Sequence, residues 1–106
     1  MRISTIGAWE IDSYYRNVNC ILIDVRDRNE YEKKHICNAV NIPLNDIKNG
    51  VADNFGWDKQ KVELVIYCER GGNSLIAAST LQRQGYRVKS VVGGINAYRG
   101  RLICND

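Results

Sequence analysis

Short apolar runs that alternate with helical segments constrain the fold of this chain more than any other feature. Cys20–Val25 is almost entirely apolar, which is typical of a short strand that is buried on both faces, and Glu63–Tyr67 is predicted as the central strand. Ala39–Pro43 and Val88–Val92 are predicted as two further strands. The spacing of apolar side chains predicts helices at 6–16, 30–34, 44–51, 73–84 and 95–99. Strands and helices that alternate through short connections form a parallel sheet with helices on both faces, so we expect an α/β fold.

The stretch from Val65 to Ser74 joins a predicted strand to a predicted helix and carries a cysteine at the junction. Cys68 ends the strand, and Gly71 and Gly72 precede the helix. Ligands of parallel α/β sheets bind at the carboxyl ends of the strands, and N–H groups at a helix start attract anions. The same N–H groups favour the thiolate form of a cysteine. A cysteine after a strand is more often a small core residue, but the double glycine favours a nucleophile.

The chain is long enough for one domain with a hydrophobic core. It has 106 residues, of which 44% are hydrophobic and 25% are charged, as in ordinary globular proteins. We predict a single domain over residues 1–106, with its core at about residues 5–104. No apolar run approaches the roughly 18 residues that cross a membrane, and Met1–Ser4 does not open the apolar segment of a signal peptide. We therefore expect a cytoplasmic protein without membrane contact.

The four cysteines do not form a recognisable framework. Cys20, Cys37, Cys68 and Cys104 are widely spread, and the chain has one histidine, His35. Neither the spacing of disulfide-rich domains nor that of zinc sites is present, so we expect reduced thiols and no metal. Cys20 is interpreted as a packing residue. Cys37 and Cys104 are interpreted as incidental residues rather than partners of an oxidised Cys68.

The charge of the chain is unevenly distributed. Residues 1–53 carry seven basic and eight acidic side chains, whereas residues 54–106 carry eight basic and four acidic ones. The basic half contains Cys68, which suits a small anionic substrate, although a solvated basic surface would give the same distribution. Nucleic-acid binding needs a denser basic stripe with stacking aromatic residues, so we predict no nucleic-acid partner. Nothing in the sequence indicates an obligate interface, and we expect a monomer.

Three separated segments resemble motifs of the rhodanese-like domain family. Ile23–Arg26 is similar to the family's Asp-Val-Arg strand end, and His35–Pro43 resembles its His-Ile-x-Gly-Ala-x-Asn-Ile-Pro segment. Tyr67–Ser74, followed by Ala77, Ala78 and Gly93–Tyr98, resembles the catalytic half of the family. The motifs occur in the family's order over nearly the whole chain. The resemblance implies a three-layer rhodanese-like fold, with a central, mostly parallel five-stranded sheet flanked by helices on both faces.

The resemblance also implies a sulfurtransferase that needs no cofactor. In this family a loop cysteine takes a sulfane sulfur from a donor such as thiosulfate as a persulfide. It then passes the sulfur to cyanide or to a thiol, which can belong to a protein. By position, Cys68 is that catalytic cysteine, and the substrate-binding residues are Glu69, Arg70, Gly71, Gly72, Asn73 and Ser74. Cysteine phosphatases of related fold place an arginine at the sixth position after the cysteine, where this chain has Ser74.

Two loop residues depart from the family pattern. Many members have an arginine where this chain has Asn73, and the carboxylate of Glu69 disfavours a neighbouring thiolate unless Arg70 offsets it. A non-catalytic rhodanese-like binding module and a thiol-redox sensor are the alternatives to a sulfurtransferase. Asp24 and Arg26 are predicted as an ion-paired scaffold beside the site.

Overall fold

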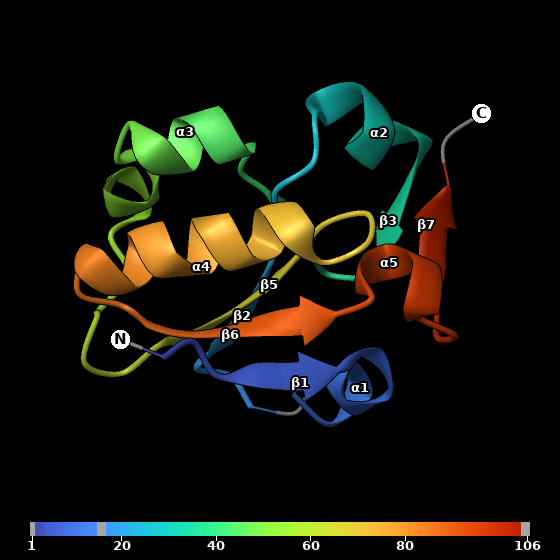
Figure 1. Ribbon diagram of the computed structural model, residues 1–106, viewed down its shortest axis with the longest axis horizontal. Coiled ribbons are helices and arrows are strands. Elements are labelled where there is room, and N and C mark those ends of the chain that lie inside the picture. Colours follow the sequence, from blue (N-terminus) through green and yellow to red (C-terminus); the bar gives the residue numbers. More distant parts are fainter. Residues whose placement is uncertain (1, 15–16, 105–106) are drawn as a thin grey trace.

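Five parallel strands form the centre of the molecule, in the order β1-β6-β5-β2-β4 (Figure 1). The computed structural model describes residues 2–14 and 17–104. The strands of this sheet are β1 (Thr5–Gly7), β2 (Cys20–Asp24), β4 (Val40–Asn41), β5 (Glu63–Tyr67) and β6 (Arg87–Val92). The helices are η1 (Ala8–Glu10), α1 (Ile11–Tyr14), α2 (Arg28–Lys33), α3 (Leu44–Lys48), η2 (Val51–Phe55), α4 (Gly72–Arg83) and α5 (Gly94–Ala97). β3 (Lys34–Ile36) and β7 (Leu102–Cys104) form a separate antiparallel pair.

The central strand β5 shows why the sheet is covered on both faces. Leu64 and Ile66 belong to one hydrophobic cluster, and Val65 and Tyr67 belong to the other. All four side chains are fully buried, because successive residues of a strand point to opposite faces of the sheet. The prediction that Glu63–Tyr67 is the central strand is confirmed, since β5 is the third of the five strands.

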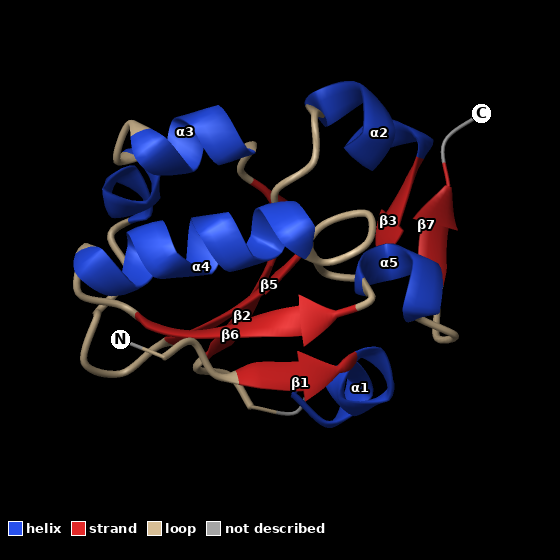
Figure 2. Ribbon diagram, viewed as in Figure 1, coloured by secondary structure: helices blue, strands red, loops and turns tan. Residues whose placement is uncertain are grey.

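Helices and short segments cover the two faces and complete three layers (Figure 2). α3 and α4 pack on one face, where Ala77, Ala78 and Leu81 of α4 are fully buried against the sheet. The opposite face is covered by η1, α1, β3 and α5, which contribute Ile11, Ile36 and other apolar side chains. Among the described helices, none is both long and apolar enough to span a lipid bilayer. The predicted three-layer α/β fold is confirmed.

The helix predicted over 6–16 is wrong in its first part. Thr5–Gly7 is the edge strand β1, in which Ile6 pairs with Val91 of β6. The backbone turns into η1 directly afterwards, and the Gly7 N–H donates to a Glu10 carboxylate oxygen at 2.7 Å. The partner strand of β1 lies far along the sequence, so local spacing of apolar residues could not reveal it. The predicted end of this helix, at 15–16, lies outside the described residues.

Candidate active site

The carboxyl ends of β2, β4 and β5 meet at one edge of the sheet, and a cleft opens there. Its volume is about 560 Å³. The residues that line the cleft are Val25, Arg26, Asp27, Glu30, Pro43, Leu44, Asn45, Cys68, Glu69, Arg70, Gly72 and Asn73. This is the position at which parallel α/β sheets bind ligands, since the loops that follow neighbouring strands converge there.

Cys68 follows β5 directly and lies at the base of the cleft. The residue is only 3% exposed, and its Sγ accepts a hydrogen bond from the Gly71 N–H at 3.0 Å. Gly71 precedes α4 and has a φ of +116°, a conformation that side-chain-bearing residues rarely adopt. The glycine thus turns its N–H back onto the sulfur, and the start of α4 adds the positive end of its dipole.

The start of α5 holds the backbone on the other side of Cys68. The Ile95 N–H donates to the Cys68 carbonyl at 2.9 Å, and the Asn96 N–H donates to the Glu69 carbonyl at 3.3 Å. A Cβ atom on Gly94 would lie 2.3 Å from the Cys68 carbonyl oxygen and 2.5 Å from that of Glu69. Gly94 is therefore a point of close packing, and it fixes the path of the loop.

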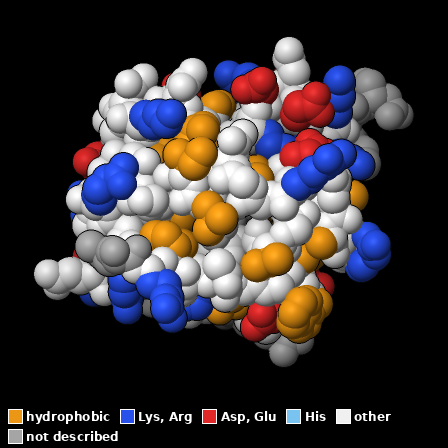
Figure 3. Space-filling view, viewed as in Figure 1, with side chains coloured by type: hydrophobic (Ala, Val, Ile, Leu, Met, Phe, Trp, Pro, Cys, Tyr) orange, Lys and Arg blue, Asp and Glu red, His pale blue; other side chains and the backbone are white. Residues whose placement is uncertain are grey.

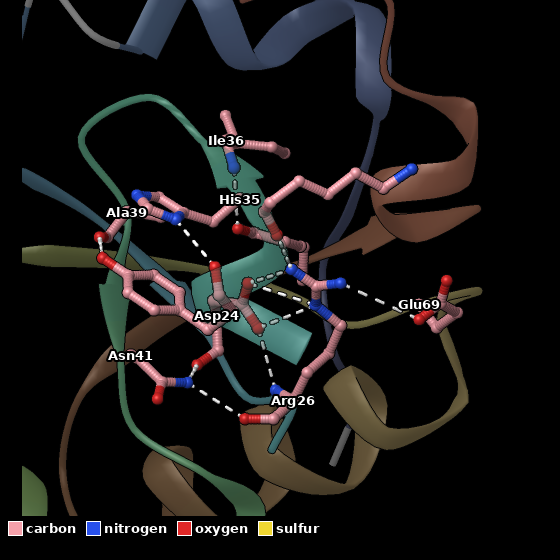
Figure 4. A network of polar contacts seen from close by, with 10 residues as sticks. Asp24, Arg26, His35, Ile36, Ala39, Asn41 and Glu69 are labelled. Carbon is pink, nitrogen blue, oxygen red and sulfur yellow. Dashed lines mark hydrogen bonds and ion pairs between the residues drawn. The ribbon is translucent and has the colours of Figure 1, made fainter. Parts of the chain in front are cut away.

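Arg26 and Asp24 form a buried ion pair beneath the cleft (Figure 4). The Arg26 Nη2 lies 2.8 Å from one Asp24 oxygen, and its Nε donates to both carboxylate oxygens at 3.1 and 3.2 Å. Nη2 also donates to the Lys34 carbonyl. Burial opposes the charged guanidinium, but the hydrogen bonds and charge of Asp24 outweigh it, so the pKa of Arg26 is raised. The predicted ion-paired scaffold is confirmed.

Tyr67 connects this ion pair to the opposite layer of the fold. Its hydroxyl oxygen accepts a hydrogen bond from the Ile36 N–H at 3.0 Å, and the Arg26 guanidinium lies 5.9 Å from its ring centroid. Burial raises the pKa of Tyr67 well above its usual range, and the charge and hydrogen bond of Asp24 raise it further. Tyr67 is therefore a neutral, fixed part of the floor beneath the site.

The loop residues predicted to bind substrate occupy three kinds of place. Glu69, Arg70, Gly72 and Asn73 line the cleft together with Cys68. Gly71 contributes its N–H to the sulfur. Ser74 is different: it is fully buried, and its hydroxyl bonds the Gly71 carbonyl at 3.0 Å and the Ser90 hydroxyl at 2.8 Å. The Ser74 side chain thus ties α4 to β6 and does not line the cleft.

The opposite wall of the cleft was not predicted as part of the site. Asp27 and Glu30 come from the loop after β2 and from α2, and Pro43, Leu44 and Asn45 come from the start of α3. One signal in the sequence could have indicated them. Both segments directly follow predicted strands, and the carboxyl ends of neighbouring parallel strands lie at the same edge of a sheet.

The remaining candidate residues lie outside the cleft. The His35 ring stacks on Tyr31 at a centroid distance of 3.8 Å and bonds the Tyr31 carbonyl through Nδ1 at 2.9 Å. Burial, followed by the charge of Glu63, raises the pKa of the Cys20 thiol to about 11, as fits a packing residue. The side chain of Cys104 lies outside the part that the structure describes. Within the described residues, no group of three or more His, Cys, Asp or Glu could hold a metal ion.

Comparisons with known proteins agree with this geometry. A family model described as "Rhodanese-like domain" matches residues 10–101. The chain is 32% identical over 106 residues to a thiosulfate sulfurtransferase named GlpE from Coxiella burnetii. The matched region covers 99% of this chain and 92% of that protein. It is also 34% identical over 85 residues to a probable molybdopterin-synthase adenylyltransferase from Porphyra purpurea, of whose length the match spans 22%.

Solved structures show the same fold. The crystal structure of the protein BH2092 from Bacillus halodurans superposes with a TM-score of 0.83 at 26% identity. That superposition covers 95% of this chain and 77% of the other. A rhodanese-like domain protein from Staphylococcus aureus superposes with a TM-score of 0.78 at 23% identity, over 98% of this chain and 100% of the other.

Proposed function

Because the chain belongs to the rhodanese-like domain family, we propose that it is a sulfurtransferase that carries a sulfane sulfur on Cys68. The observation that supports this most strongly is the position of Cys68 Sγ, at the base of an open cleft and 3.0 Å from the Gly71 N–H. A backbone donor at that position stabilises negative charge on sulfur without a general base. The relative named a thiosulfate sulfurtransferase matches this chain over nearly its whole length, which favours the same class of reaction.

The first step loads the sulfur onto the protein. The Cys68 thiolate attacks the outer, sulfane sulfur of the donor and forms a sulfur–sulfur bond. The bond between that sulfur and the rest of the donor breaks, and its electron pair leaves with the departing group, which is sulfite when the donor is thiosulfate. Cys68 then carries a persulfide, whose negative charge the Gly71 N–H and the start of α4 stabilise.

The second step returns the protein to its starting state. A thiolate or cyanide attacks the terminal sulfur of the persulfide, and the sulfur–sulfur bond breaks with its electrons returning to the Cys68 Sγ. Splitting one transfer into two displacements lets a donor and an acceptor use the same cleft in turn. We propose a small sulfur donor and a thiol or cyanide acceptor, which includes a protein thiol, for a single domain over residues 1–106 in the cytoplasm.

A turnover assay tests this proposal. The purified protein is mixed with cyanide and, in separate reactions, with thiosulfate, an organic thiosulfonate or an organic persulfide, and thiocyanate is measured. We expect thiocyanate formation with at least one donor, its loss in Cys68→Ser, and its retention in the matched variant Cys20→Ser, whose thiol lies outside the cleft. Turnover that survives Cys68→Ser, or its absence with every donor, would refute the proposal.

A further inference from the structure

One nitrogen of the Arg26 guanidinium faces the cleft rather than the interior. Nε and Nη2 are directed at Asp24, and Nη2 also reaches the Lys34 carbonyl. Nη1 points the other way, toward the Glu69 carboxylate, whose Oε2 lies 3.8 Å from it (Figure 4). A guanidinium held on one edge by a buried carboxylate presents its other edge in a fixed direction, as in sites that bind anions. The cleft thus contains a fixed cationic group that follows β2, the strand beside β5 in the sheet.

Glu69 is the residue whose carboxylate approaches this nitrogen of Arg26 within the cleft. Its backbone is fixed, because the Asn96 N–H bonds its carbonyl and Gly94 packs against it. Its side chain is 51% exposed and approaches Arg26 only at 3.8 Å, beyond hydrogen-bonding distance. An ion pair of this length and exposure is weak. The Glu69 carboxylate therefore remains a negative charge at the cleft that Cys68 also lines, rather than a charge cancelled by Arg26.

The other charges of the cleft add to this effect. Asp27 and Glu30 also line the cleft, whereas the only further cation among its lining residues is the exposed Arg70. Asp24 already balances the charge of Arg26. Figure 3 shows acidic and basic side chains interspersed over α2 and the neighbouring loop, rather than a surface of positive charge. The cleft therefore has no net positive field to attract a dianion.

We propose that Glu69 selects donors by charge, so that Cys68 reacts preferentially with organic persulfides and thiosulfonates over the dianion thiosulfate. The sulfur donors in this inference are those of the proposed function, on which it rests. The selection itself depends on the charge of Glu69 next to Arg26. With an organic persulfide, the Cys68 thiolate attacks the outer sulfur, the bond to the inner sulfur breaks, and an organic thiolate leaves. Charge balances in this step, because the reactants are one thiolate and one persulfide anion and so are the products.

Alkylation tests the charge selection without any sulfur transfer. Iodoacetamide and iodoacetate have nearly the same shape and differ by one negative charge, so the ratio of their rates at Cys68 cancels any change in thiolate reactivity. The rates are followed by mass spectrometry of the peptide that contains Cys68. We expect Glu69→Gln to raise the ratio of iodoacetate to iodoacetamide by about threefold to tenfold at low salt, from one unit charge at close range. Added salt should reduce the gain.

A matched variant separates a local effect from the charge of the whole molecule. Glu32 is 57% exposed, pairs with Arg28 and does not line the cleft, so Glu32→Gln removes the same charge elsewhere. We expect this variant to keep the native ratio. An unchanged ratio in Glu69→Gln, or an equal rise in Glu32→Gln, would overturn the inference.

Sulfur donors complete the test. Thiosulfate and methanethiosulfonate deliver the same sulfur atom but differ by one charge, and Glu69→Gln should raise the ratio of their loading rates by a similar factor. Equal acceleration of both donors would overturn the inference and leave the proposed function intact. If the alkylation ratio rises as expected but no donor loads the native protein, the charge selection by Glu69 stands and the sulfurtransferase proposal fails.

Discussion

Gly94→Ala is expected to disturb the loop of Cys68 by placing a methyl group against the backbone of that loop. The new Cβ would lie 2.3 Å from the Cys68 carbonyl oxygen, 2.5 Å from the Glu69 carbonyl oxygen and 2.6 Å from the Glu69 carbonyl carbon. These are backbone atoms, which cannot rotate away as a flexible side chain would. Relief requires that α5 and the loop move apart, which breaks the hydrogen bond from the Ile95 N–H to Cys68.

The expected loss in the free energy of unfolding is the sum of two separable costs. Gly94 has a φ of +60°, and a side chain in the left-handed region costs about 1–2 kcal/mol. Overpacking against fixed atoms costs about 1–3 kcal/mol more. Gly56→Ala is the matched control, because Gly56 has a φ of +72° and nothing lies within 4 Å of its added Cβ. Gly56→Ala should therefore lose only the cost of the left-handed backbone, about 1–2 kcal/mol.

Urea unfolding and the alkylation rate of Cys68 measure the two consequences. The free energy of unfolding should fall by about 2–5 kcal/mol in Gly94→Ala and by about 1–2 kcal/mol in Gly56→Ala. Alkylation of Cys68 by iodoacetamide should change in the first variant and remain native in the second. Equal destabilisation of the two variants would refute the idea that α5 fixes the loop by close packing.

Two further predictions concern buried polar side chains. Asp24→Asn should lower the free energy of unfolding in urea by about 3–5 kcal/mol, because it leaves the charge of the buried Arg26 without its partner carboxylate. The control Arg28→Met, at an exposed ion pair, should change that free energy by less than about 0.5 kcal/mol. Similar losses in the two variants would contradict the prediction. Stability should also fall as the pH rises above about 10, because Tyr67 and Tyr86 ionise there only in the unfolded chain. Burial, then the hydrogen bond to Asp53, raises the pKa of Tyr86 to about 12, so Tyr86→Phe should flatten this dependence in urea unfolding between pH 8 and 11, and an unchanged slope would count against it.

The strand, loop and helix around Cys68 were predictable because each is specified locally. The apolar run of β5, the glycines before α4 and the small residues of α4 all lie within one continuous segment. The edge strand β1 was missed for the opposite reason. It has three residues, Thr5–Gly7, and its strand conformation depends on pairing with β6, which lies at Arg87–Val92.

The sequence predicted only the wall of the cleft that is formed by the loop after Cys68. Asp27, Glu30 and Asn45 reach the cleft because β2 lies beside β5 and β4 lies beside β2, and that strand order is set by packing rather than by local sequence. The inward orientation of Ser74 likewise depends on how α4 is rotated against β6, where the Ser74 and Ser90 hydroxyls form a hydrogen bond. The pairing of Arg26 with Glu69 joins two segments that only the folded sheet brings together.

The intact mass of the protein after incubation with sulfur donors tests the central claim most directly. The native protein, Cys68→Ser and Cys20→Ser are each incubated with thiosulfate and, separately, with an organic thiosulfonate or persulfide. After the donor is removed, the intact mass of each protein is measured by mass spectrometry. We predict a gain of one sulfur atom in the native protein and in Cys20→Ser, no gain in Cys68→Ser, and removal of the added sulfur by cyanide. No gain with any donor, or a gain that persists in Cys68→Ser, would contradict a Cys68 persulfide.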